Sequence, residues 1–161
     1  MISEKMEEDP AFYEKFSKLI QQAIDDFKAR RINDLEYLNQ VTGIRNKVAT
    51  KQHDEVPEQI RGNEEACAYY GVVSPFFMAY DLKPDQREAI VAETSLAIQE
   101  IIHRHWKVDF WNDADAQKAA MNDIDDFLYD QVKDQYGLSL SLAQMDDIIE
   151  KTVQIARRRR H

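Results

Sequence analysis

The sequence has few of the residues that form turns and almost none that form covalent cross-links. Its 161 residues include four glycines, four prolines and one cysteine. This scarcity of turn formers, together with 32% charged and 43% hydrophobic residues, predicts an all-α protein with a real core. A chain of this length is expected to form a single helical domain over residues 1–161. The lone cysteine, Cys67, excludes an internal disulfide and fits a reducing compartment.

Long apolar runs are also missing. No stretch approaches the roughly 20 apolar residues that a membrane helix needs. The opening "MISEKMEEDP" is acidic and lacks the apolar segment of a signal peptide. The sequence is therefore typical of a soluble, cytoplasmic protein without a membrane partner.

The common sequence motifs of cofactor binding and catalysis are absent as well. There is no glycine-rich phosphate loop, no dinucleotide-binding fingerprint, no nucleophile elbow and no paired C-x-x-C. The sequence thus predicts no cofactor, no metal site and no catalytic residue.

Charge is unevenly distributed. The net charge is -9, yet the last eleven residues, "KTVQIARRRRH", carry five basic groups and no acidic one. An acidic protein repels nucleic-acid phosphates except where a basic patch overrides the repulsion. Arg157, Arg158, Arg159 and Arg160 are therefore a possible DNA or partner contact. The alternative is a solvated helix end, where cations complement the helix dipole.

Apolar residues at three- and four-residue steps predict a bundle of about six helices, mostly antiparallel. The second helix carries its apolar stripe at Leu35, Leu38, Val41, Ile44 and Val48. The segment "VVSPFFMAYDL" contains a proline and is expected to form a buried connection, a short helix or an apolar interface. The other expected helices span Pro10–Arg31 after an Asp9 cap, Asp34–Lys51, a segment following Asn63, Pro84–Trp106, Asp113–Tyr136, and a last helix capped by Ser139 or Ser141.

The segment "IQEIIHRHWKVDFWNDADA" is the richest in candidate chemistry. Glu100 and His103 form one E-x-x-H pair, but di-iron bundles need two such pairs pointing inward. At about 100° per residue, both side chains lie opposite the apolar face of their helix. His105 lies on that apolar face and is expected to be a packing residue near the helix end.

The remaining residues of this segment have structural explanations too. Asp113 and Asp115 lack the glycine and the final glutamate of a calcium loop, and Asn112 as cap accounts for acidic residues at a helix start. Trp106, Phe110 and Trp111 are predicted to form an aromatic corner between two helices. Cys67, in an acidic setting, is predicted to be a buried structural thiol.

Four stretches in order resemble the C-terminal helical region of type I restriction enzyme R subunits. They are "EDPAFYEKFSKLIQQAIDDF", "NEEACAYYGVV", "HWKVDFWNDADAQKAAMNDIDDFLYDQV" and "MDDIIEKTVQIARRRR". The resemblance implies a C-terminal fragment of a longer chain, whose other domains carry an Mg-dependent endonuclease and an ATP-driven DNA translocase. It implies a non-catalytic assembly domain that docks the R subunit onto the methyltransferase and specificity subunits, with DNA contact possible. ATP and Mg are expected in the other domains, and the family supplies no catalytic residue for this segment.

Two other functions stay open from the residues alone. One is a stand-alone α-helical metal-binding protein that uses Glu100, His103 and nearby acids. The other is an independent nucleic-acid-binding helical domain that uses the terminal arginines.

Overall fold

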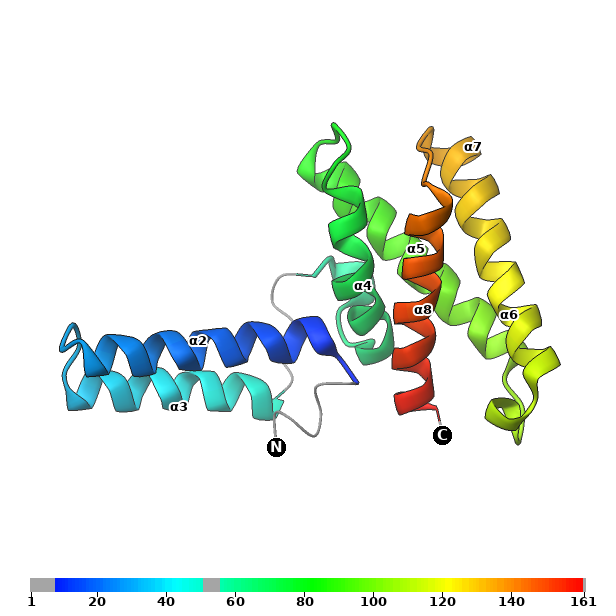
Figure 1. The fold of residues 1–161 in the computed structure, drawn as a ribbon. Coiled ribbons are helices and arrows are strands. Elements are labelled where there is room, and N and C mark those ends of the chain that lie inside the picture. Colours follow the sequence, from blue (N-terminus) through cyan, green and yellow to red (C-terminus); the bar gives the residue numbers. More distant parts are fainter. Residues whose placement is uncertain (1–7, 51–55, 161) are drawn as a thin grey trace.

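The computed structural model describes residues 8–50 and 56–160, and the part of the chain that it describes is all-α (Figure 1). The prediction of a bundle of about six helices is confirmed. Four helices form an upright body, and a hairpin of two helices projects from its side (Figure 1). We call these two parts the body and the arm.

The body contains α4 (Glu64–Phe77), α5 (Pro84–His105), α6 (Ala114–Asp126) and α8 (Leu142–Arg159). Successive helices run in opposite directions, as the colour order in Figure 1 shows. Their facing sides share one large apolar core. Its fully buried large side chains include Tyr69, Phe77, Ile98, Ile102, Ile124, Leu128, Met145, Ile148 and Ile155.

Side-chain caps define where three of these helices, and the first helix of the arm, begin. Asp9, Asn63, Asp113 and Ser141 each accept a hydrogen bond from the backbone N–H three residues further on. Ser141 also belongs to a reciprocal capping box with Gln144, which satisfies two backbone donors at the start of α8. Such caps typically contribute about 1 kcal/mol each. The expected cap at Asn112 is wrong by one residue, because Phe110–Asn112 form a separate 3-10 turn, η2.

The segment around Pro75 is helical, which settles an alternative that the sequence left open. α4 continues through Pro75 to Phe77, with Val73 and Phe77 fully buried in the core. Within the apolar segment 72–80, Val73 and Phe77 therefore belong to the core, whereas Val72 is half-buried and Pro75 and Met78 are exposed. Apolar residues at four-residue spacing continue the buried face of α4 across the proline.

A wider helical turn lies between α6 and the next helix. α6 is followed without a break by a π-helical turn, η3 (Phe127–Gln131), and then by α7 (Val132–Tyr136). Ile124, Leu128 and Val132 are all buried, although a four-residue repeat drifts by about 40° per step in a regular α-helix. The wider π turn reduces this drift and keeps the three side chains on the core.

The arm consists of α2 (Pro10–Lys28) and α3 (Asp34–Thr50), as the predicted hairpin. Its base has a small core of Phe12, Tyr13, Phe16 and Val48. The expected burial of the whole α3 stripe is wrong at its outer end. Leu35 and Leu38 are 66% and 60% exposed, because the outer half of the arm extends beyond the body, where no other described helix covers it (Figure 1).

Gly71 determines how closely the arm approaches the body. A Cβ atom added at Gly71 would lie 2.6 Å from the Cβ of Ala11, well inside van der Waals contact. Ala11 is the second residue of α2, so the missing side chain on α4 admits the start of the arm. The resulting contact between α2 and α4 joins the two parts.

Candidate functional site

The predicted aromatic corner lies where α5 turns into α6. The ring centroids of Trp106 and Phe110 are 5.6 Å apart, those of Phe110 and Trp111 are 4.7 Å apart, and those of the two tryptophans are 6.1 Å apart. Asp109 adopts a left-handed conformation, with φ of 64°, which turns the chain between the rings. Phe110 is buried, whereas the two tryptophans are half-buried.

The C-terminal end of α8 packs against this corner through Arg160. The Arg160 guanidinium donates from Nε and Nη2 to the two carboxylate oxygens of Glu65, at 2.9 and 3.0 Å. It also lies 6.0 Å from the ring centroid of Trp106, and the Trp111 indole N–H donates to the Arg160 carbonyl. A planar guanidinium that makes two parallel bonds to a carboxylate is the strongest type of ion pair between side chains. Arg160 therefore joins α8, α4 and the corner.

Arg159 makes a second set of contacts on the same end of the body. Its Nε donates to the Glu8 carbonyl at 2.7 Å, and its Nη1 lies 3.8 Å from a carboxylate oxygen of Glu64. Arg157 is exposed and lies 5.3 Å from the ring centroid of Trp111, and Arg158 is also exposed. Arg159 and Arg160 are thus half-buried, whereas Arg157 and Arg158 are exposed.

Electrostatics around Arg160 reflect its burial and its partners. Burial acts to lower the pKa of Arg160, but the hydrogen bond and the charge of Glu65 outweigh it and hold that pKa above its ordinary value. The pKa of Tyr69 is raised, first by burial and then by the nearby Glu65 carboxylate. Glu65 thus contributes to both shifts, whereas burial is the larger cause of the Tyr69 shift.

The other polar candidates have structural roles. Glu100 and His103 are exposed, as their helical positions predicted, and His103 Nδ1 lies 3.5 Å from Arg160 Nη1. His105 has a partner that the sequence did not reveal, because its Nε2 lies 2.6 Å from an Asp123 carboxylate oxygen. In residues 8–50 and 56–160, no three His, Cys, Asp or Glu side chains are placed to hold a metal ion.

Asp113 and Cys67 also fit structural roles. The Asp113 carboxylate lies 2.5 Å from Lys107 Nζ and caps α6. The Lys107 hydrogen bond, followed by that of the Ala116 N–H, lowers the pKa of this carboxyl. Cys67 is 3% exposed, and its thiol donates to the Ile60 carbonyl at 3.3 Å. Burial is the first cause that raises its pKa to about 11, so the thiol is unreactive at neutral pH.

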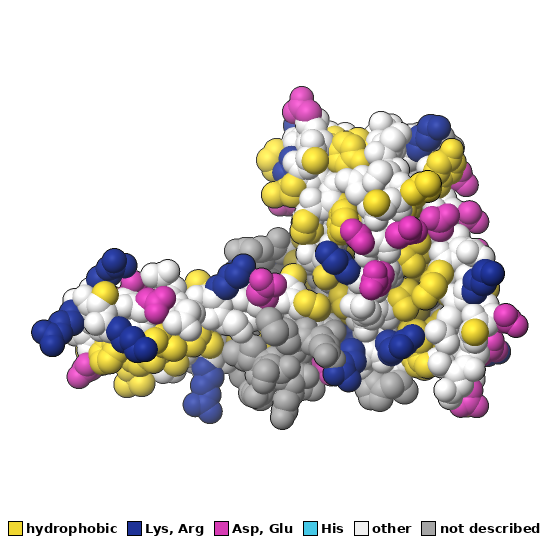
Figure 2. Space-filling model, viewed as in Figure 1, with side chains coloured by type: hydrophobic (Ala, Val, Ile, Leu, Met, Phe, Trp, Pro, Cys, Tyr) yellow, Lys and Arg dark blue, Asp and Glu magenta, His cyan; other side chains and the backbone are white. Residues whose placement is uncertain are grey.

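A groove runs along the junction of the arm and the body, between α2 on one side and α4, α6 and α8 on the other. Its apolar lining includes Leu19, Val72, Pro75, Met121, Ile149 and Val153. Figure 2 shows hydrophobic side chains over the front of the body, with Lys and Arg side chains near the C-terminal end of α8. We call this feature the groove.

The groove has a basic rim on an otherwise acidic protein. Five basic side chains line it, against three acidic ones, in a chain whose net charge is -9. One acid and two lysines of this rim have partners nearby: Lys18 Nζ lies 3.2 Å from Glu14, and Lys151 Nζ lies 5.2 Å from the Phe76 ring centroid. The basic members are Lys15, Lys18, Lys151, Arg157 and Arg158, and the acidic ones are Glu14, Asp146 and Glu150.

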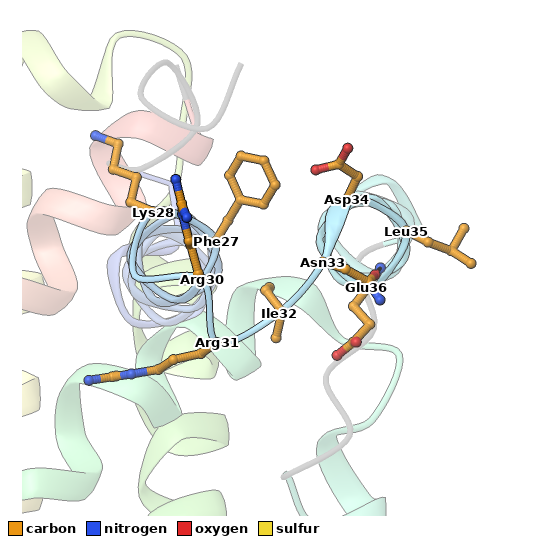
Figure 3. Close-up of a pocket in the computed structure, with 9 residues that line it drawn as sticks. All are labelled: Phe27, Lys28, Arg30, Arg31, Ile32, Asn33, Asp34, Leu35 and Glu36. Carbon is orange, nitrogen blue, oxygen red and sulfur yellow. Dashed lines mark hydrogen bonds between the residues drawn. The ribbon is translucent and has the colours of Figure 1, made fainter.

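A second, shallower hollow lies at the tip of the arm, between the end of α2 and the start of α3. Figure 3 shows that Lys28 and Arg31 point away from α3, whereas Leu35 points away from α2. Arg31 Nη1 lies 3.4 Å from Asp26, and the rings of Phe27 and Tyr37 stack at 4.7 Å. These contacts close the hairpin turn, so the hollow is a consequence of the turn.

Sequence reasoning placed Arg157 and Arg158 at a surface but missed the groove that they border. Lys15, Lys18 and Lys151 occupy the polar faces of their helices, where lysine is ordinary. These lysines come together only because of the angle between α2 and α8, and the apolar spacing within either helix does not predict that angle.

No family model, no curated protein sequence and no solved structure matches this chain. None of the helices in the described ranges combines the length and apolar character that a membrane span requires.

Proposed function

We propose that this chain is a non-catalytic assembly domain, the C-terminal helical domain of a type I restriction R subunit. It docks the ATP-dependent translocase and endonuclease subunit onto the methyltransferase and specificity subunits. The observation that carries the proposal is the groove, an apolar, basic-rimmed surface on an otherwise acidic protein. The sequence resemblance to R subunits supplies the identity of the partner.

The two rival functions have weaker support. A metal-binding protein would need ligands that converge, whereas Glu100 and His103 face outward and belong to no group of three ligand-type side chains in the described ranges. An independent nucleic-acid-binding domain would need a free basic cluster, whereas Arg159 and Arg160 bind Glu64 and Glu65. An assembly role accommodates both observations.

The decisive experiment measures binding of this chain to the purified methyltransferase–specificity complex by isothermal titration calorimetry. We expect one chain to bind per docking site with a Kd of micromolar or tighter, because interfaces of ordinary size reach that range. The same complex without its methyltransferase subunits serves as the control. Absence of heat and of co-elution at 50-fold molar excess would refute the assembly role.

An auxiliary DNA contact is proposed for the exposed arginines. Arg157 and Arg158 face solvent, so they can reach phosphates without breaking the pairs of Arg159 and Arg160. Replacing both by alanine should reduce the slope of log affinity against log salt by about 2 if each contacts one phosphate. An unchanged slope would remove DNA from the list of partners.

A further inference from the structure

We propose that the groove accepts an amphipathic α-helix with acidic flanks, supplied by the partner complex. The inference rests on the proposed function for the identity of the partner, but its physical argument concerns the groove alone. Three observations carry it: the shape of the groove, its apolar lining and the charge of its rim.

The walls of the groove favour a helical occupant. α2, α4, α6 and α8 line it, and the backbone N–H and C=O groups within these helices already bond to one another. An extended peptide would therefore bury backbone groups that find no partners, at a cost that natural interfaces avoid. A helix satisfies its own backbone and presents side chains to such a groove. The groove follows α8 from Asp146 to Arg158, about 18 Å at the rise of an α-helix, so three turns of a partner helix fill it.

The lining specifies the face of the occupant that enters. Val72 and Met121 are half-buried, Leu19 is exposed, and all three present apolar atoms to the groove. Ile149 and Val153, one turn apart on α8, lie beneath them. Leucine, isoleucine or phenylalanine at three- and four-residue steps on the occupant would cover this strip.

The rim specifies the charge of the occupant. Lys18 and Lys151 border the groove from α2 and α8, and Arg157 lies beside its end. Elsewhere the protein is strongly acidic, so an acidic helix is attracted to this site and repelled from most other surfaces. A nucleic acid fits less well, because a phosphate backbone would leave the apolar lining of the groove uncovered.

The test compares two double charge reversals. Lys18→Glu/Lys151→Glu changes both walls of the groove, and Lys83→Glu/Lys118→Glu changes exposed lysines that do not line it. Both variants alter the net charge equally, so non-specific electrostatics cancel. We expect the groove variant to bind the methyltransferase–specificity complex at least tenfold more weakly, mainly through slower association at low salt. The control should bind within twofold of the unmodified chain.

Two synthetic peptides separate this inference from the proposed function. Each has 18 residues with leucine at helical spacing, and glutamate fills the polar positions in one, lysine in the other. We expect binding of the acidic peptide, tenfold loss in the groove variant, and about threefold loss in Leu19→Ala, which removes apolar contact without changing charge. The lysine peptide should bind at least tenfold more weakly than the acidic one.

The outcomes discriminate between the two proposals. If the complex binds both double variants equally, the groove inference fails and the assembly role stands. If the complex does not bind the unmodified chain but the acidic peptide does, the assembly role fails and the groove inference stands. Dimerisation that Lys18→Glu/Lys151→Glu abolishes, or loss of duplex DNA binding in place of peptide binding, would overturn the groove inference by naming a different occupant.

Discussion

The ion pair between Glu65 and Arg160 offers the sharpest quantitative test of how the body is held together. We consider Glu65→Gln, Arg160→Met and the double variant. Glutamine keeps the shape of glutamate and loses its charge, and methionine keeps an unbranched apolar stem that can replace the packing of arginine. The Trp111 bond to the Arg160 backbone carbonyl is unaffected by either change.

The expected magnitude follows from burial and geometry. The two side chains are 13% and 18% exposed, and two short hydrogen bonds join them. Hydrogen bonds to charged groups contribute about 1.5–3 kcal/mol, and removing one partner leaves the other charge partly buried without compensation. Each single variant should therefore lower the free energy of unfolding by about 2 kcal/mol. The double variant should lose about 2–3 kcal/mol, which gives a coupling energy of about 1–2 kcal/mol.

The assay is urea unfolding at pH 7, followed by circular dichroism and by tryptophan fluorescence. Trp106 and Trp111 are the two tryptophans of the chain and lie beside Arg160, so their emission reports on this end of the body. Arg104→Met removes one charge from an exposed arginine of α5 and should change stability by less than about 0.5 kcal/mol. A coupling energy below about 0.5 kcal/mol would show that the pair contributes no more than a surface ion pair. It would refute the claim that this pair holds the C-terminal end of α8 against α4.

Three further predictions concern the contact between arm and body, the thiol and the aromatic corner. Gly71→Ala should lower the free energy of unfolding by about 1–2 kcal/mol, even though alanine favours a helix more than glycine does. Adding Ala11→Gly to this variant should restore most of the lost stability, and equal melting temperatures of Gly71→Ala and the unmodified chain in calorimetry would contradict the close contact. Because folding raises the pKa of Cys67 from 9.0 to about 11, its contribution to stability is complete below pH 9 and is lost as the pH rises to 11. The unmodified chain should therefore lose about 1 kcal/mol more than Cys67→Ala between pH 8 and pH 10 in urea titrations, and equal losses would contradict the shift. Phe110→Ala should cost about 3–4 kcal/mol and the half-buried Trp111→Ala about 2 kcal/mol, and the reverse order in melting experiments would mean that the wrong ring is buried.

Local features of the fold were predictable because local interactions produce them. Asp9, Asn63 and Ser141 cap helices as expected, since a cap needs a short polar side chain directly before an apolar repeat. The outward positions of Glu100 and His103 followed from 100° per residue alone. Such predictions succeed where the determining residues lie within one or two turns.

Features that depend on distant residues could not be predicted. Arg160 and Glu65 are separated by 95 positions, and nothing in "RRRR" indicates which arginines find carboxylates. The apolar stripe of α3 showed that a face needs covering, but not that Leu35 and Leu38 extend beyond the body. The groove has the same origin, because helical periodicity contains no information on the angle between two helices.

The contact between Gly71 and Ala11 makes the arm a lever. From Ala11 to Lys28, α2 extends about 25 Å at 1.5 Å per residue, so a rotation of 10° at its base moves the tip by about 4 Å. A single methyl group on α4 would force such a rotation, because the two backbones already approach as closely as their side chains allow. Position 71 therefore sets where the far end of the arm points, even though it lies a full helix length away.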